Sequence, residues 1–224
     1  MRILLKFPTR SRPELFKATM QEYLDKSVTN PLVVVSIDHD DPTMNNQPMM
    51  DWMEERGIEY HIGRSRTKIQ AINANIPSEG WDILVLGSDD HIPVVDMWDA
   101  LIEQYFCSMS PNGEPCQLWF KDIRQEAMNK GEQVCFMPVM NRACYNLDGY
   151  IYHPSYESLW CDNEQTEVNT KRGILHRIDT EVFRNESHHW GGSVKHDGLY
   201  YRNNKPFSRD ERNFKRRKQL GFTK

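Results

Sequence analysis

Residues 82–93, DILVLGSDDHIP, decide the fold class that this sequence predicts. The apolar run at residues 83–86 is typical of a strand that is buried on both faces. Soon after it come two adjacent carboxylates, Asp89 and Asp90, and then His91. Neighbouring like charges repel each other unless a positive group lies beside them. We therefore expect this strand to end at a site that holds a cation.

The first half of the chain repeats the same unit of strand, polar loop and helix. Buried strands are expected at residues 3–7, 31–37, 58–62 and 82–86. Helices are expected from Pro13, over residues 49–56, from a Ser65 cap through Ile76, and over residues 95–106. This alternation predicts an α/β fold with a Rossmann-like, mostly parallel sheet that is flanked by helices.

After Pro111 the alternation weakens. Residues 116–120 and 133–140 have the apolar character of strands, but residues 145–164 are aromatic, rich in turns and irregular. Long irregular segments in a compact domain often carry function. We therefore expect a single domain, residues 1–224, made of a regular half at 1–110, an irregular half at 111–201 and a basic tail at 202–224.

Charged and polar segments follow all four expected strands of the first half. They are PTRSRP at 8–13, DHDDP at 38–42, GRSR at 63–66 and GSDDHIP at 87–93. In open parallel sheets, ligands bind beyond the carboxyl ends of the strands, so these segments should meet around one ligand. Their composition favours an anionic ligand that binds together with a metal ion.

Most of these segments also have a purely structural interpretation. Asp38, Asp40 and Asp41 could bind the base or ribose of a nucleotide, or they could end a strand and start a turn. Arg64 and Lys68 could bind a phosphate at the start of a helix, or they could be ordinary basic residues on a surface helix. Because Arg64 and Lys68 follow an expected strand, we regard the phosphate-binding and the structural interpretation as about equally supported.

The adjacent carboxylates favour one interpretation. Mg²⁺ or Mn²⁺ shared with substrate phosphates typically uses only one or two protein carboxylates. The alternative is a helix N-cap, in which Asp89 or Asp90 opens a helix near Val94. A cap explains one aspartate but not a pair followed by His91, so we favour the metal.

Two later motifs add candidate residues. Asp162 and Glu164, in LWCDNE, follow an aromatic stretch. A carboxylate in an apolar setting can have a raised pKa and act as a general base. The alternative is structural, since D-N-E is also a common turn. His188 and His189, in ESHHWGG, could supply a metal ligand, although most single histidines do not bind metals.

The composition narrows the class of protein. Apolar residues make up 38% of the chain and charged residues 27%, which indicates neither a membrane-spanning nor a disordered protein. The N-terminal apolar run is too short for a secretion signal, and five cysteines without a C-x-x-C pair indicate free thiols in a reducing compartment. We therefore expect a cytoplasmic protein.

The C-terminal segment has a charge of its own. Residues 202–224 contain nine Lys or Arg and two acidic residues, while the whole chain has a net charge of −4. Such a basic end could contact a polyanion, contact an acidic surface of its own domain, or form a solvated helix.

Together, these motifs resemble those of GT-A-type glycosyltransferases, similar to the family 2 enzymes. The resemblance rests on FPTRSRP (7–13), SIDHDDP (36–42), RTKIQAIN (66–73) and LGSDDHIP (86–93), with looser matches in LWCDNE (159–164) and SHHWGG (187–192). These segments occur in order between about residues 3 and 192. The resemblance implies a GT-A-like fold whose half at 1–110 binds a nucleotide-sugar and whose half at 111–201 binds the acceptor.

The resemblance also implies roles for single residues on the nucleotide side. Pro8, Thr9 and Arg12 would line the base pocket. Asp38 or Asp40 would contact the base or the ribose, and Arg64 or Lys68 would lie beside the diphosphate. Asp89, in the position of the family's D-x-D motif, would approach the ribose.

On the catalytic side, the resemblance implies a metal ion and a base. Asp90 would bind Mn²⁺ or Mg²⁺, and His188 or His189 would complete the metal shell. Asp162 would match the general base of the family's E-D motif.

The sequence departs from the family pattern at three places. Ser88 stands where the first Asp of D-x-D is expected, and a D-x-H arrangement, with Asp89 and His91 on the metal, also occurs in similar enzymes. Cys161 replaces the Glu of E-D, which leaves the base on Asp162 alone. Asn185 could take the position of the late histidine.

The implied activity is a metal-dependent, inverting transfer of a hexosyl or pentosyl group from a nucleotide-sugar, with a UDP-sugar as the first candidate. The acceptor hydroxyl would belong to a saccharide or to a hydroxymethylated pyrimidine in DNA. The DNA acceptor fits a small phage-type enzyme that acts in the host cytoplasm. Aromatic residues between Tyr145 and Trp160 could stack on the acceptor, or they could pack the core.

Two other classes compete with a glycosyltransferase. One is a non-catalytic nucleic-acid-binding protein that uses the basic tail. The other is a nucleotidyltransferase with a similar α/β nucleotide site, which would release pyrophosphate.

Overall fold

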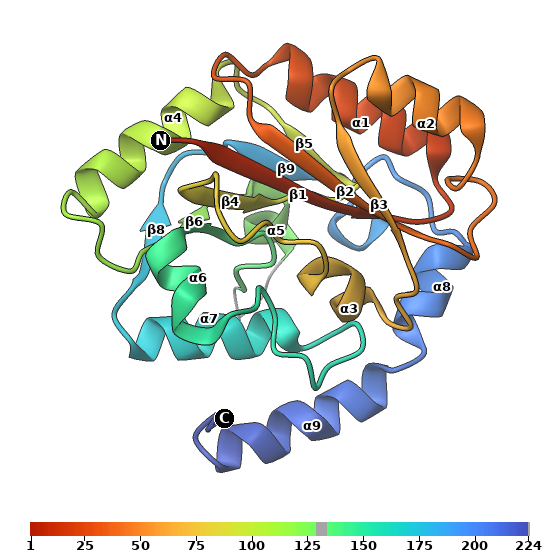
Figure 1. The fold of residues 1–224 in the computed structure, drawn as a ribbon. Coiled ribbons are helices and arrows are strands. Elements are labelled where there is room, and N and C mark those ends of the chain that lie inside the picture. Colours follow the sequence, from red (N-terminus) through yellow and green to blue (C-terminus); the bar gives the residue numbers. More distant parts are fainter. Residues whose placement is uncertain (129–133, 224) are drawn as a thin grey trace.

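The computed structural model describes residues 1–128 and 134–223 of the chain. Its centre is a seven-stranded sheet with the strand order β3-β2-β1-β4-β7-β6-β8 (Figure 1). The strands are β1 (Ile3–Thr9), β2 (Leu32–Asp38), β3 (Glu59–Gly63), β4 (Ile83–Leu86), β6 (Gln117–Phe120), β7 (Val139–Asn141) and β8 (Leu175–Ile178). Only β7 runs against the others, because β4 and β6 both pair with it in antiparallel fashion. The predicted mostly parallel α/β sheet is thus confirmed.

The first half follows the expected alternation. Helices α1 (Pro13–Asp25), α2 (Gln47–Glu54) and α3 (Lys68–Asn73) connect the parallel strands β1, β2, β3 and β4, and α4 (Trp98–Met109) comes later. The register pairs Thr9 with Ile37 and Asp38 with Gly63, so the carboxyl ends of β1, β2 and β3 lie at one edge. This places the polar segments that follow these strands next to one another.

Helix α3 differs from its prediction at both ends. Its N-cap is Thr67, whose hydroxyl accepts the Gln70 N–H at 3.1 Å, and the expected Ser65 cap is wrong. The helix ends at Asn73 because Ala74 is extended, so Ile76 lies outside it. The Thr67 hydroxyl, two residues further along the chain, satisfies the helix start, because threonine is also among the preferred N-cap residues.

Apolar side chains cover both faces of the sheet. Helices α1, α2 and α4 pack on one face, where Phe16, Met53 and Trp98 are buried (Figure 1). Helices α3, α6 (Arg142–Asp148), α7 (Cys161–Lys171) and α9 (Phe207–Gln219) pack on the other face. Strands that are buried on both sides explain the continuous apolar runs of the sequence.

The second half is more regular than expected. Helices α6 and α7 extend into the segment at 145–164 that was expected to be irregular, and only residues 149–160 of that segment lie outside both helices. The strand expected at 133–140 is reduced to β7, since residues 134–138 are not in a strand and Gln133 lies outside the described residues. A separate ribbon pairs β5 (His91–Pro93) with β9 (Phe183–Asn185).

The basic tail folds back onto the domain as α8 (Gly198–Asn204) and α9. The Arg217 guanidinium binds the buried Glu164 carboxylate at 2.7 and 2.8 Å. The Asp210 carboxylate accepts the N–H groups of residues 157–159. Of the three alternatives for this segment, contact with acidic groups of its own domain is the one observed. Within the described residues, no helix is both long and apolar enough to cross a membrane.

Candidate active site

A cavity of about 430 Å³ opens beyond the carboxyl ends of β1, β2 and β4. Pro8, Thr9 and Asp38 line it from the ends of β1 and β2, and Asp89 and Asp90 line it from the segment after β4. The chain reaches this edge of the sheet three times because parallel strands return it to the same side. Three of the four polar segments thus line one space, as expected, whereas no residue of GRSR at 63–66 lines it.

Asp89 is the deeper of the two adjacent carboxylates. The Thr9 hydroxyl donates to its Oδ1 at 3.1 Å, and the Thr19 hydroxyl donates to its backbone carbonyl at 2.7 Å. Burial raises the pKa of Asp89 to about 8. The Arg12 guanidinium lowers this pKa, and the charge on Asp90 raises it further. Asp89 is therefore largely protonated at neutral pH in the absence of other ligands.

Asp90 has the opposite character. The Ser88 hydroxyl donates to its Oδ1 and the Tyr200 hydroxyl to its Oδ2, each at 2.6 Å. Burial would raise its pKa, but the charge on His91 and these two hydrogen bonds outweigh burial and lower the pKa to about 2. The two neighbours thus avoid mutual repulsion because one holds a proton and the other is ionised.

The positive group beside the pair is Arg12. Its Nη1 lies 4.0 Å from the Asp90 carboxylate, and its Nε and Nη2 donate to Asp197 at 2.7 and 2.9 Å. The guanidinium lies 4.2 Å from the centre of the Tyr200 ring. The alternative of a helix cap is wrong, because residues 91–93 form β5 and the next helix begins at Trp98.

Sequence reasoning missed Asp197 and Tyr200, which α8 brings to the site. No motif marks them, and Asp197 lies five residues before the segment that we expected to be a basic tail. Asp197 caps α8 by accepting the Tyr200 N–H at 3.0 Å, so one carboxylate both starts the helix and holds Arg12. Only the tertiary fold shows this connection.

Asp162 lines the same cavity from the first turn of α7. Burial raises its pKa, while the Lys68 ammonium and the Asn163 N–H, which donates to Oδ1 at 3.0 Å, act in the opposite direction. A carboxylate with a raised pKa that faces a cavity can accept a proton. Glu164, the other carboxylate of LWCDNE, is instead tied up with Arg217 and Tyr156.

Lys68, the first residue of α3, also lines the cavity. Its charge lowers the pKa values of both Asp90 and Asp162, so it acts on two carboxylates of the cavity at once. Within the described part of the chain, its ammonium forms no hydrogen bond or ion pair. It is therefore free to contact an anion that enters the cavity.

Three of the residues to which the resemblance gives a role do not line the cavity: Asp40, Arg64 and His188. Asp40 is held by Arg10, which donates to it at 2.6 Å and to Asp38 at 2.7 Å. Arg10 itself lines the cavity, although the sequence analysis gave it no role. It belongs to the PTRSRP segment, so that motif carried the signal that could have identified it.

The histidines of ESHHWGG lie beside Tyr200. The ring centres of His188 and Tyr200 are 4.9 Å apart, and those of His188 and His196 are 4.7 Å apart. His189 lines the cavity, and partial burial together with the neighbouring histidines lowers its pKa. The buried Nδ1 of His188 has no hydrogen-bond partner among the described residues.

A metal ion would find one ionised carboxylate here. Among the residues that the structure describes, no three His, Cys, Asp or Glu side chains are grouped so that they could hold a metal. Mg²⁺ and Mn²⁺ that are shared with phosphates need only one or two carboxylates. Asp90, with His189 in the same cavity wall, could hold a divalent ion if its remaining ligands came from a diphosphate and water.

No family model and no curated protein sequence matches the chain. Among solved structures, S. aureus TarS 1–349 matches with a TM-score of 0.58 at 10% identity, over 83% of this chain and 60% of that one. The mannosyltransferase PcManGT of Pyrobaculum calidifontis, in complex with GDP-Man and Mn²⁺, matches with a TM-score of 0.58 at 13% identity, over 81% and 55%. A cytidylyltransferase of Leptospira borgpetersenii matches with a TM-score of 0.51 at 15% identity, over 81% and 76%.

These likenesses concern the fold. The chain spans 60% and 55% of the lengths of the first two structures. At such low sequence identity the comparison shows the architecture and leaves the chemistry to the site itself. The chain has the mixed α/β fold of the GT-A glycosyltransferases, as its motifs implied.

Proposed function

We propose that the chain transfers a sugar from a nucleotide-sugar to an acceptor hydroxyl with inversion at the anomeric carbon. One observation carries the proposal. A single cavity at the carboxyl ends of the strands is lined by Asp90, whose pKa is lowered to about 2, by Asp162, whose pKa is raised by burial, and by Lys68, which has no hydrogen bond or ion pair among the described residues. This combination suits a reaction in which a hydroxyl loses a proton while a diphosphate gains charge.

The nucleotide would bind at the ends of β1 and β2. Pro8, Thr9 and Asp38 would contact the base and ribose, and Asp89 would approach the ribose. Arg10, which already pairs with Asp38 and Asp40, would hold these carboxylates in place. Arg64 lies outside the cavity lining, so we assign the diphosphate to Lys68.

In the transfer step, Asp162 removes the proton of the acceptor hydroxyl. The acceptor oxygen forms a bond to the anomeric carbon as the bond from that carbon to the diphosphate oxygen breaks, and the electron pair leaves with the nucleoside diphosphate. Lys68 stabilises the charge that develops on the leaving group. A divalent ion bound to Asp90, with His189 or His188 beside it, would supply further positive charge at that position.

Several observations support a nucleotide-sugar donor and a divalent ion. TarS 1–349 has been solved with UDP-GlcNAc, and PcManGT with GDP-Man and Mn²⁺. We propose a UDP-sugar with Mn²⁺ or Mg²⁺ as the first combination to test. The intracellular location expected from the free thiols would give such an enzyme access to nucleotide-sugars.

A nucleotidyltransferase is the second candidate, and the likeness to a cytidylyltransferase favours testing it. The two reactions differ in their products, since a nucleotidyltransferase releases pyrophosphate and a glycosyltransferase releases a nucleoside diphosphate. A non-catalytic nucleic-acid-binding protein has less support. Arg217, Lys218 and Arg209 of the basic tail are paired with glutamates of the same chain.

The first test is thermal unfolding with UDP, GDP and CDP and their sugars, each with Mn²⁺, Mg²⁺ or a chelator. A ligand that binds only the native state raises the unfolding temperature. We expect one nucleotide series to stabilise the protein and the chelator to abolish the effect, and Asp90→Asn to weaken the metal-dependent part. Absence of any shift would contradict the proposal, and analysis of the released phosphate species would separate the two enzyme classes.

A further inference from the structure

Two aromatic rings form part of the cavity wall. Phe136 and Trp190 both line the cavity that holds Asp162, their ring centres are 6.2 Å apart and their planes are inclined by only 19°. Phe136 is half-buried against the apolar core, whereas Trp190 is half-buried and belongs to neither core cluster. A large apolar ring that faces a cavity and is not packed in the core is a candidate contact surface for a ligand.

The aromatic residues expected from the sequence do not play this part. Tyr152 and Tyr156 are only 3% and 1% exposed, and Trp160 stacks on Phe214 of α9 at 5.3 Å. For these residues the core interpretation is correct. Two more aromatic side chains line the cavity in the described part of the chain, but Tyr152 is almost fully buried and the Tyr200 ring lies between Asp90 and Arg12. This leaves Phe136 and Trp190 as the aromatic pair that we consider as a contact surface for a ligand.

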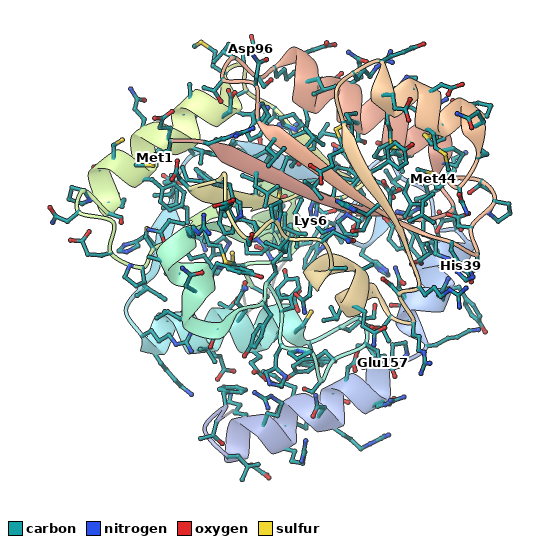
Figure 2. All side chains as sticks on the ribbon, viewed as in Figure 1. Met1, Lys6, His39, Met44, Asp96 and Glu157 are labelled. Atoms are coloured by element: carbon teal, nitrogen blue, oxygen red, sulfur yellow. The ribbon has the colours of Figure 1, made fainter. Side chains whose placement is uncertain are left out.

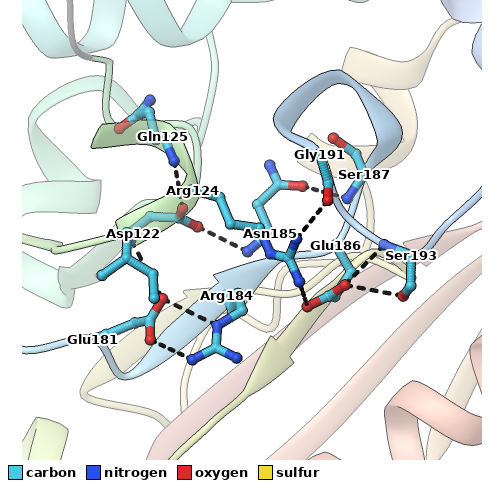
Figure 3. Close-up of polar contacts among 11 residues, drawn as sticks. Asp122, Arg124, Gln125, Glu181, Arg184, Asn185, Glu186, Ser187, Gly191 and Ser193 are labelled. Atoms are coloured by element: carbon cyan, nitrogen blue, oxygen red, sulfur yellow. Dashed lines mark hydrogen bonds and ion pairs between the residues drawn. The ribbon is translucent and has the colours of Figure 1, made fainter. Parts of the chain in front are cut away.

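The loop that carries Trp190 is held in place by Arg124 and Glu186 (Figure 3). Arg124 donates to the Glu186 carboxylate at 2.7 Å and to the Gly191 carbonyl at 2.6 Å. The second Glu186 oxygen accepts the N–H and O–H of Ser193, both at 2.9 Å. The loop is thus bound on both sides of the tryptophan.

Close packing of the backbone adds to this restraint. A Cβ atom on Gly192 would lie 2.1 Å from the Glu186 carbonyl, so only glycine permits the loop to close on itself. The short helix η1 (His188–Trp190) then fixes where the indole points. A ring that is positioned before binding costs little conformational entropy when a ligand packs against it.

The charge of this part of the wall is also informative. Gln125 and Asn163 line the cavity with Val134 and Leu159, and all four side chains are uncharged. The guanidinium of Arg124 is committed to Glu186 and Gly191. A nucleic-acid strand needs cations beside its phosphates, and neither these four side chains nor Arg124 provides a free one. Lys68 and Arg202 line the same cavity from α3 and α8, and Lys68 is assigned above to the diphosphate of the donor.

We propose that Phe136 and Trp190 form the acceptor subsite and that the acceptor is an uncharged saccharide. This rests on the proposed function. A sugar ring presents C–H groups on one face and hydroxyl groups at its rim. The face packs against Trp190, and the amides of Gln125 and Asn163, which can both donate and accept, bind the hydroxyls.

The test uses wild-type protein, Trp190→Ala and Trp190→Phe with a UDP-sugar and Mn²⁺. Methyl glycosides of glucose, galactose and mannose serve as acceptor probes, beside a single-stranded oligonucleotide that contains 5-hydroxymethylcytosine. Loss of an aromatic contact should raise the saccharide KM roughly tenfold in Trp190→Ala. Trp190→Phe should restore most of the affinity, and the Kd for UDP should stay unchanged in both variants.

Two matched controls separate the subsite from general damage. Trp52→Ala removes an indole that packs on Phe16, away from the cavity, and should leave the saccharide KM unchanged. Arg124→Ala should raise the KM as Trp190→Ala does, because it frees the loop. Arg184→Ala breaks the neighbouring ion pair with Glu181, which holds no part of the loop (Figure 3). This variant should leave the saccharide KM unchanged.

The outcomes are distinguishable from failure of the proposed function. If wild-type protein binds no nucleoside diphosphate, the proposed function is wrong. Saccharide binding, followed by NMR line broadening of the methyl glycosides, needs no turnover and tests the subsite independently. The saccharide subsite would be overturned by any of three results. These are an unchanged saccharide KM and line broadening in Trp190→Ala, no binding of any methyl glycoside, and transfer to the oligonucleotide alone.

Discussion

At the scale of single residues, three carboxylates of one cavity differ in their pKa values. Asp89, Asp90 and Asp162 line one cavity, yet one carboxylate has a pKa near 8, one has a pKa near 2, and burial raises the pKa of the third. Neighbouring hydroxyls and cations cause the differences. The sequence identified all three residues, but it could not assign their charge states, because these depend on Arg12, Ser88 and Tyr200 in space.

Asp162→Asn tests the proposed base. The amide cannot accept the acceptor proton, so kcat should fall by roughly 10²- to 10⁴-fold while the Kd for the donor is unchanged. Turnover with the identified donor and isothermal titration with UDP measure the two quantities. Asp179→Asn, which changes an exposed carboxylate paired with Lys121, is the control. Near-normal turnover in Asp162→Asn would exclude it as the base.

Lys6 is a buried cation that the proposed reaction does not use. It lies in the middle of β1 (Figure 2), is fully buried and donates to the Ser36 hydroxyl. Burial lowers its pKa from 10.5 to about 7. Between these values the unfolded chain holds one more proton than the native protein, so the free energy of unfolding should rise with pH by up to about 1.4 kcal/mol per unit.

Lys6→Met removes this dependence. The variant should be about 1–4 kcal/mol more stable at pH 7, because Ser36 keeps its hydrogen bond to Asn75 and no charge remains buried. Its stability should also change less between pH 7 and 10 than that of the wild type. Urea unfolding at several pH values checks this, with the exposed Lys195→Met as the control. Equal pH slopes in Lys6→Met and wild type would show that Lys6 does not titrate in this range.

At the scale of elements, the sequence predicted the β1 to α4 half well and the rest less well. Long apolar runs are local signals, so β1, β2, β3 and β4 lie within a residue or two of their expected positions, whereas the short strands β5, β8 and β9 were not predicted. The shortness of β7 and the return of α8 to the site depend on contacts between distant segments. For that reason Asp197 and Tyr200 could not be found from local patterns.

Tyr200→Phe tests how α8 affects the site. The Tyr200 hydroxyl donates to Oδ2 of Asp90, the carboxylate that we propose binds the metal, and hydrogen bonds to charged groups contribute about 1.5–3 kcal/mol. A metal that displaces this hydroxyl should therefore bind more tightly in Tyr200→Phe. Titration of Mn²⁺ in the presence of UDP, followed by electron paramagnetic resonance, measures the affinity. Tyr201→Phe, an exposed neighbour, is the control, and weaker Mn²⁺ binding in Tyr200→Phe would mean that the hydroxyl supports the metal site.

At the scale of the whole molecule, the acidic and basic parts of the chain neutralise each other. The sequence showed the uneven distribution of charge, but it left three partners open for the basic end. The structure pairs that end with Glu164, Glu167 and Glu157. Because α9 packs on α7, which also carries Asp162, the docking of the C-terminal helix and the integrity of the cavity are connected.

Arg217→Ala tests this connection. The substitution leaves the Glu164 carboxylate buried without its cation, which should cost about 3–5 kcal/mol of stability. Arg216→Ala, at the exposed neighbouring position, should change stability by less than about 0.5 kcal/mol. Urea unfolding measures the stability of both variants, and titration of the folded variants with UDP measures whether the cavity still binds the nucleotide. If the two variants were equally stable, the ion pair would not hold α9. If Arg217→Ala were destabilised but bound UDP normally, docking of α9 would matter for the fold and not for the nucleotide half of the site.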